Sequence, residues 1–153
     1  MRELDEFQRL DVLVGIHEGE ETREDEMSSA DIAAVHEFGS EDGTIPERSF
    51  LRAGSDHYSE EIGEAFSTAF RKITTGERVS ARRELERIGL FGQAKIREYI
   101  TVVGQGVWPD ISEATKKAKG STAILIDTGQ LRRDVTYSVQ ANPNAERVIM
   151  RGI

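Results

Sequence analysis

The chain has 153 residues, of which 37% are apolar and 31% charged, and this balance predicts a single globular domain over residues 1–153. It has no cysteine, which excludes a disulfide scaffold, a thiolate zinc site and a cysteine nucleophile. No apolar run approaches the roughly 20 residues that span a bilayer. Because Glu3, Asp5 and Glu6 make the first ten residues acidic, we expect no signal peptide there.

The net charge of −8 is unevenly placed along the chain. Residues 1–31 hold 11 acidic and 3 basic side chains, which gives −8, whereas residues 32–153 hold 17 of each. Proteins that bind nucleic acid usually show the opposite sign, because phosphate contacts need Lys and Arg. The charge pattern therefore disfavours sequence-specific binding of DNA or RNA.

The first predicted element is a strand over residues 11–16, which are rich in β-branched and aliphatic side chains. Residues 17–31 follow as a predicted acidic, exposed loop, because the segment has little to bury. Two interpretations of this loop stay open. It is either a plain solvated loop or an acidic surface that faces DNA in a channel or a basic patch on a partner.

A helix is predicted over residues 29–38, with Ser28, Ser29 or Asp31 as the cap. Its apolar side chains recur at helical spacing on one face: Ile32, Val35 and Phe38. Gly39 is a natural end for this helix. Residues 39–50 then read as a long loop with a turn at Gly43, and a loop of this length is often functional.

Two long amphipathic helices are predicted next, over residues 53–74 and 80–103. The apolar face of the first is Tyr58, Ile62, Phe66, Phe70 and Ile73, and that of the second is Ala81, Leu85, Ile88, Gly92, Ile96, Tyr99 and Val103. Gly89 and Gly92 each weaken a helix by roughly 1 kcal/mol relative to Ala, and in return they permit another backbone to approach closely. Gly104 and Gly106 are predicted to end the helical pattern.

The last third of the chain predicts shorter elements. Residues 110–113 resemble a capping box that opens a short helix ending at Gly120, and residues 123–126 are apolar. Residues 127–131 read as a capped turn, residues 132–140 as a strand, and residues 147–153 as its return strand. The order of elements predicts an α+β fold, with a small antiparallel sheet packed against two long amphipathic helices.

No catalytic or phosphate-binding motif occurs in the sequence. The three histidines, His17, His36 and His57, fall on three different predicted elements without a ligand spacing, so we expect no metal and no cofactor. Asp127 is the best candidate for a general acid, and capping of the next turn is the stronger interpretation. Trp108 is the only tryptophan, and it is expected either to anchor a loop internally or to anchor a contact between subunits.

Two segments together carry a resemblance to a known family. They are AAVHEFGSEDGTIPERSFLRAG at residues 33–54 and LIDTGQLRRDVTYSV at residues 125–139, the second preceded by ISEATKKAKG at residues 111–120. This combination resembles the virion-morphogenesis and tail-completion family of tailed bacteriophages, over most of residues 11–140. The chain departs from the family pattern at Ser49, where many members have proline.

The resemblance implies a structural protein, not an enzyme, at the phage neck or the top of the tail. It implies a homo-oligomeric ring, with six copies expected from virion symmetry, in contact with other neck and tail proteins. DNA would pass through without sequence-specific contact, no membrane would be involved, and assembly would take place in the host cytoplasm. The interface is expected at Glu37, Phe38, Gly39, Ile45, Pro46, Arg48, Phe50, Leu51, Trp108, Asp127, Thr128, Gly129 and Leu131, and the channel-facing acidic residues at Glu20, Glu21, Glu24, Asp25 and Glu26.

The residues of the first motif also have a physical reading. Phe50 and Leu51 would dock the loop onto the core or onto a neighbour, and Arg48 would pair with Glu37 or with a carboxylate of the next subunit. Rival interpretations are a head–tail connector or tail terminator, a small metal-dependent hydrolase that uses His17, His36 and Glu37, and a regulatory module that binds a host protein through its acidic segment.

Overall fold

The computed structural model describes residues 2–17, 28–109 and 130–143. By their contacts these residues group into two compact units. The first unit contains residues 2–14, 58–92 and 137–143, and the second contains residues 15–17, 28–57, 93–109 and 130–136. The single domain predicted over residues 1–153 stays a prediction.

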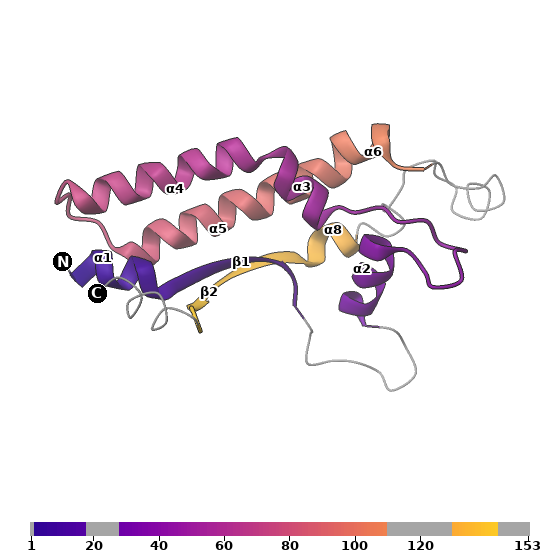
Figure 1. The fold of residues 1–153 in the computed structure, drawn as a ribbon, viewed down its shortest axis with the longest axis horizontal. Helices are drawn as coiled ribbons and strands as arrows, with labels where there is room; N and C mark the ends of the chain where they lie inside the picture. The colour runs from indigo at the N-terminus through magenta and orange to yellow at the C-terminus, as the bar shows by residue number, and fades with distance from the viewer. Residues whose placement is uncertain (1, 18–27, 110–129, 144–153) are drawn as a thin grey trace, which may run out of the picture. The chain divides into compact units, whose positions relative to one another are not determined.

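The fold is α+β, as the sequence predicted, with two long helices and a two-stranded antiparallel sheet (Figure 1). In chain order the elements are α1 (Arg2–Arg9), β1 (Leu10–Ile16), α2 (Ser29–Phe38), α3 (Leu51–His57), α4 (Ser59–Thr74), α5 (Ala81–Glu98), the π-helical turn η1 (Tyr99–Val103), α6 (Gly104–Val107), α8 (Gln130–Asp134) and β2 (Val135–Ala141). The strand partner of β2 is β1, which the sequence pattern alone left open.

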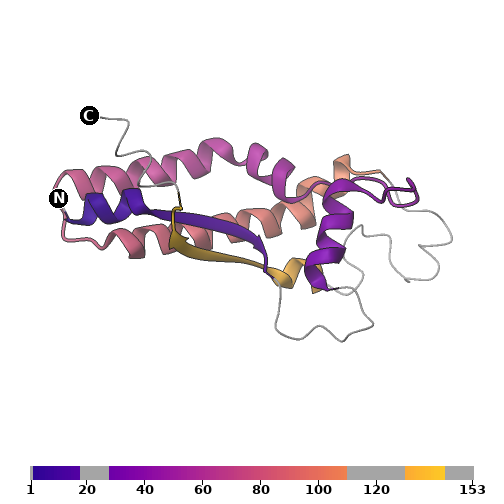
Figure 2. The same cartoon turned by 60° about the horizontal axis from the view of Figure 1, so that its bottom comes forward.

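The core of the first unit forms around α4 and α5. Ala69, Leu85 and Ile88 are buried at its centre, at 5% exposure or less. Partly buried side chains from α1, both strands and α4 pack around them: Phe7, Leu10, Val12, Ala65, Phe66 and Val139. Figure 2 shows α1 beside α4, where the ring centroids of Phe7 and Phe66 are 6.5 Å apart in an edge-to-face contact.

Polar contacts fix the start of α5 in the same unit. The carboxylate of Glu3 accepts a hydrogen bond of 2.7 Å from the backbone N–H of Ala81. Glu84 is 5% exposed, and it accepts from Lys72 Nζ at 3.1 Å and from Arg87 Nη1. These bonds satisfy a backbone donor at a helix end and a buried carboxylate, both of which are costly to leave unpaired. Helix α1, which supplies Glu3, is an element that the sequence analysis missed.

The helical glycine Gly89 does permit a close approach, but from a side chain and not from a backbone. The ring of Tyr137 on β2 lies against it, so that a Cβ built on Gly89 would stand 2.3 Å from Tyr137 Cδ2. A Cβ on Gly92 would stand 3.1 Å from Val14 Cγ2. The two glycines thus let the sheet side chains pack directly on the α5 backbone.

Two predicted helix boundaries were wrong. The helix predicted over residues 53–74 is interrupted at Tyr58, where φ is −102° and ψ is 17°, and it divides into α3 and α4. Tyr58 is only 6% exposed, so tertiary packing of its ring overrides local helix propensity. The predicted break at Gly104 and Gly106 does not occur, because the chain continues through η1 into α6. Gly104 stays helical and is covered by the ring of Trp108.

The strand predicted over residues 132–140 begins too early. Residues up to Asp134 belong to α8, and β2 starts at Val135. Arg97 fixes this junction, since its Nη2 donates to the backbone oxygens of Arg133 at 3.0 Å and Val135 at 2.8 Å. The predictions for residues 110–129 and for the return strand 147–153 lie outside the described residues.

Candidate functional site

The first motif segment builds a helix, a loop and a second helix in the second unit. Helix α2 begins with a capping box, in which Ser28 Oγ accepts from the N–H of Asp31 at 3.1 Å and Asp31 Oδ2 accepts from the N–H of Ser28 at 3.1 Å. It ends at Gly39, whose φ of +79° favours glycine. A Cβ at Gly39 would stand 3.1 Å from both Glu47 N and Ile45 O, so the two arms of the loop pass close together there.

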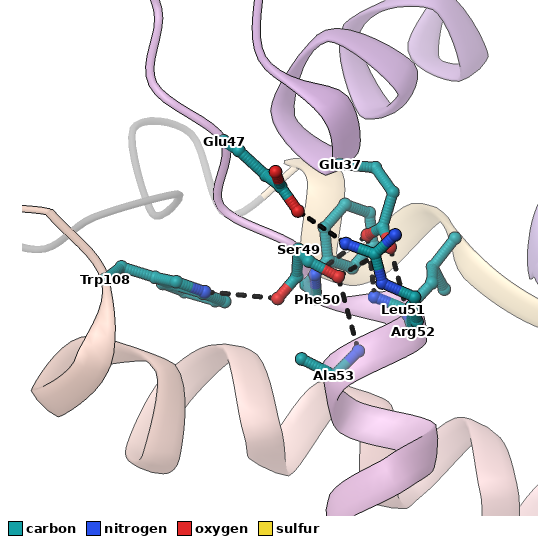
Figure 3. A network of polar contacts seen from close by, with 8 residues as sticks. All are labelled: Glu37, Glu47, Ser49, Phe50, Leu51, Arg52, Ala53 and Trp108. Carbon is teal, nitrogen blue, oxygen red and sulfur yellow. Dashed lines mark hydrogen bonds and ion pairs between the residues drawn. The ribbon is translucent and has the colours of Figure 1, made fainter.

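Glu37 lies at the centre of this segment and is 5% exposed (Figure 3). Its Oε2 accepts from the backbone N–H groups of Phe50 at 2.8 Å and Leu51 at 2.9 Å. Its Oε1 accepts from the N–H of Arg52 at 3.0 Å and from the hydroxyl of Ser49 at 2.7 Å. The carboxylate of α2 therefore caps the first turn of α3 from 13 to 15 positions away along the chain.

These four bonds also set the protonation state of Glu37. Burial alone would raise the pKa of its carboxyl. The hydrogen bonds from Leu51, Ser49, Arg52 and Phe50 stabilise the charged form and together outweigh burial, so the pKa is lowered from the ordinary value of 4.5. Each oxygen already accepts from two donors, so the hydrogen-bonding capacity of the ionised carboxylate is used within the loop.

Ser49 and Phe50 close the loop onto the unit. Ser49 Oγ accepts from the N–H of Ala53 at 3.3 Å while its hydroxyl donates to Glu37, so one side chain serves both ends of the loop. Phe50 is fully buried, which places its side chain in the core of the chain itself, and the interface role expected for it stays a prediction. The role of Ser49, which lies two positions before the first residue of α3, was not predicted from the sequence.

Trp108 holds the end of the loop at Ser49 by a hydrogen bond. Its Nε1 donates to the backbone oxygen of Ser49 at 3.1 Å (Figure 3). Its ring lies over Gly104 and meets Tyr99 edge to face, with centroids 5.8 Å apart. The pKa of Tyr99 is raised by burial and by the negative charge of Glu37. Trp108 thus acts as an internal anchor of the loop, and the contact between subunits that was the second expectation stays a prediction.

The outer part of the loop is a turn with bonds of its own. Asp42 accepts from the hydroxyls of Ser40 at 2.6 Å and Thr44 at 2.7 Å, and from the N–H of Thr44 at 2.9 Å. These bonds lower the pKa of the Asp42 carboxyl to about 2. Gly43 has a φ of +72°, in agreement with the predicted turn. The turn, residues 41–44, is exposed, so its shape is fixed without burial.

The expected interface residues fall into three groups by burial. Those buried in the unit are Glu37, Arg48, Phe50 and Leu131; those half-buried are Gly39, Ile45, Pro46, Leu51 and Trp108; and Phe38 is exposed at 70%. Arg48 Nε donates to the backbone oxygen of Pro109 at 3.4 Å. The remaining expectations, Asp127, Thr128 and Gly129 for the interface and Glu20, Glu21, Glu24, Asp25 and Glu26 for the channel, lie outside the described residues. Of the predicted acidic loop, residues 29–31 instead form the start of α2, and Ser28 is its N-cap.

The apolar face of α2 does not point into the unit. Ile32 is 41% exposed and Phe38 is 70% exposed, whereas Ala33 and Glu37 are buried. The physical reason is the polar contact of Glu37 with α3, which requires that side of α2 to face the unit. The small side chain of Ala33 lies on the same side. The apolar stripe therefore faces outward.

No group of three or more His, Cys, Asp or Glu side chains that could hold a metal ion occurs among residues 2–17, 28–109 and 130–143. Within the same ranges, no helix is both long and apolar enough to cross a membrane. Glu37, the carboxylate that the hydrolase interpretation requires, is committed to the loop.

The geometry defines an α+β protein in which two helices are joined by a loop that a buried carboxylate closes. No protein-family model, no curated protein sequence and no solved structure matches the chain.

Proposed function

We propose that the protein is a structural component of a tailed-phage virion, located at the neck or the top of the tail, where it completes the tail and helps to join it to the head. The proposal is supported by the order of the two motif segments over residues 33–54 and 111–139, which resembles the tail-completion family. One structural observation carries it furthest: the first motif forms a prefolded loop whose ends are held by hydrogen bonds of Glu37, Ser49 and Trp108.

A loop of this kind is better suited to binding another protein than to catalysing a reaction. Glu37, Ser49 and Trp108 hold the two ends of the loop, so the exposed turn pays little conformational entropy when a partner binds it. Phe38 offers a large aromatic surface next to that loop. Aromatic side chains of this kind are enriched at protein interfaces.

In this proposal the protein forms a ring around the DNA channel, with six copies expected from the family resemblance. The acidic segment would line the channel and repel phosphate. Charge reversal of Glu20, Glu21, Glu24 and Glu26 to lysine is then expected to hinder DNA ejection or the retention of packaged DNA. Unchanged infectivity of that variant would remove the acidic lumen from the proposal and leave the rest intact.

The location is tested on purified particles of the phage or prophage that encodes the chain. Mass spectrometry is expected to find the protein in tail-containing particles, and its absence from them would favour a regulatory module instead. Negative-stain images of particles made without the gene are expected to show filled heads lying apart from finished tails. Tails of uncontrolled length would favour the second candidate, a tail terminator or a connector at another level of the neck.

A further inference from the structure

Strand β1 has a hydrogen-bonding edge that faces away from β2. Among the described residues the sheet consists of these two strands, which lie side by side in Figure 2. The backbone N–H of Asn142 donates to the carbonyl oxygen of Arg9 at 2.8 Å, which fixes the register of the pair. In an antiparallel ladder, the backbone groups of successive residues point to opposite sides of the strand. Since Arg9 faces β2, Leu10, Val12 and Val14 direct their N–H and C=O groups to the other side, which we call the β1 edge.

The outer edge of β2 is covered by side chains of α5. The same register directs the carbonyl oxygens of Val135 and Val139 away from β1. Arg82 Nη1 donates to the oxygen of Val139 at 3.4 Å, and Arg97 Nη2 donates to that of Val135 at 2.8 Å. Both bonds agree with an alternation that runs along the strands without a bulge, which supports the register assigned to β1.

The β1 edge has no such cover within residues 2–17, 28–109 and 130–143, where no backbone hydrogen bond from outside the sheet reaches Leu10, Val12 or Val14. Leu10 and Val12 pack against the core, yet all three side chains are only half-buried. Proteins usually protect an open edge with lysine, proline or a bulge, and Leu10–Val14 contains neither lysine nor proline. A further strand would satisfy the backbone groups and cover the remaining apolar surface.

The charge beside the β1 edge is negative. Asp11 and the 43% exposed Leu13 lie on the outer face of the sheet, since Val12 between them packs against the core. Residues 2–16 hold four acidic and two basic side chains, which gives −2, and the whole chain carries −8. A second copy would bring the same negative sign to this edge, and like charges across paired strands are destabilising. A segment with positive charge is the complementary occupant.

We propose that the β1 edge binds an extended, positively charged segment of another protein, which adds to the sheet as a third strand. Main-chain hydrogen bonds to Leu10, Val12 and Val14 give the affinity. A lysine or arginine beside Asp11, with apolar side chains turned toward the core, gives the specificity. This docking depends on β1 alone, so it does not require the proposed function.

Hydrogen exchange of the full-length protein tests the edge in the free state. The amides of Val12 and Val14 should exchange faster than those of Asp11 and Leu13, which face β2. Slow exchange at Val12 and Val14 would show that the edge is already occupied and would overturn the proposal. Protection that rises with protein concentration alone would identify a second copy as the occupant and would overturn it as well.

A short synthetic peptide of alternating lysine and valine is the probe for binding. On addition of this peptide, the amides of Val12 and Val14 should become protected, whereas those of Asp11 and Leu13 should change little. The same peptide with glutamate in place of lysine should bind at least about tenfold more weakly. N-methylation of the peptide amides that face β1 should abolish binding, because it removes the donors. Absence of binding by the lysine peptide, or equal binding by any of the three peptides, contradicts the proposal.

Two protein variants locate the binding on β1. Val12→Pro removes a donor of the edge and should abolish binding, while the sheet should stay folded because this N–H points away from β2, which circular dichroism checks. Asp11→Lys leaves the backbone unchanged and should weaken binding of the lysine peptide by roughly two- to fivefold. Glu60→Lys, an exposed carboxylate of α4, is the matched control and should bind like the natural chain. Natural affinity in both β1 variants would place the peptide elsewhere and overturn the proposal.

Discussion

The helix pair of the first unit and the loop of the second unit are held together by different physics. In the first unit, Leu85 and Ile88 recur along α5 and remove apolar surface from water. In the second unit, a buried carboxylate satisfies three backbone donors and one hydroxyl from the start of α3. The apolar core is spread over several side chains, whereas the loop depends on the position of one side chain, Glu37.

The largest loss of stability is expected from the apolar core. Leu85→Ala removes a side chain that is 1% exposed and leaves a cavity, so the free energy of unfolding should fall by about 2–5 kcal/mol. Leu90→Ala, on the same helix at 57% exposure, is the matched control and should stay within about 0.5 kcal/mol. Denaturant titration measures both. Equal losses in the two variants would mean that the described burial of α5 is wrong.

Glu37→Gln tests the hydrogen bonds that close the loop of the second unit, because the side chain keeps almost the same volume. The amide has only one acceptor oxygen, so at least one buried donor loses its partner, and unfolding should become easier by about 1–3 kcal/mol. Hydrogen exchange should show faster exchange at the amides of Phe50, Leu51 and Arg52 than in the natural chain. Glu41→Gln, an exposed carboxylate in the same loop, is the control. Unchanged exchange at those three amides in Glu37→Gln would contradict the capping role.

Gly89→Ala tests how closely the side chain of Tyr137 packs on α5 in the first unit. The new Cβ would stand 2.3 Å from Tyr137 Cδ2, so β2 or α5 must move, at a cost of about 1–3 kcal/mol. Gly63→Ala in α4 is the matched control, because nothing lies within 4 Å of its Cβ position. That variant should gain up to about 1 kcal/mol from helix propensity. Thermal unfolding of the two variants should therefore shift in opposite directions.

The smallest effect is the pH dependence that Glu37 adds. The pKa of its carboxyl is lower in the folded protein than the ordinary 4.5, so its contribution is complete above about pH 4.5. The contribution is lost as the pH falls through the folded pKa. The difference in stability between the natural chain and Glu37→Gln should accordingly shrink in acid. A difference that stays constant from neutral pH to below the folded pKa would show that the charge of Glu37 is not what holds the loop.

The candidate site could be predicted only in part. The capping box of Ser28 and Asp31, the helix end at Gly39 and the turn at Gly43 are local features, so they follow from residue types at fixed spacing. The partners of Glu37 lie 12 to 15 residues away, and no local rule specifies them. The same contact leaves Ile32 and Phe38 exposed, although their helical spacing places them on one apolar face of α2.

What the sequence by itself determined is the set of elements whose apolar residues repeat at regular intervals. The buried face of α5, with Ala81, Leu85 and Ile88, and the α+β class follow directly from such spacing. Tertiary structure decided the interruption at Tyr58, the pairing of β2 with β1 and the closure of the loop by Glu37. Periodicity reports which side of a helix is apolar, but a single long-range polar contact can outweigh it, because a buried carboxylate must find its donors.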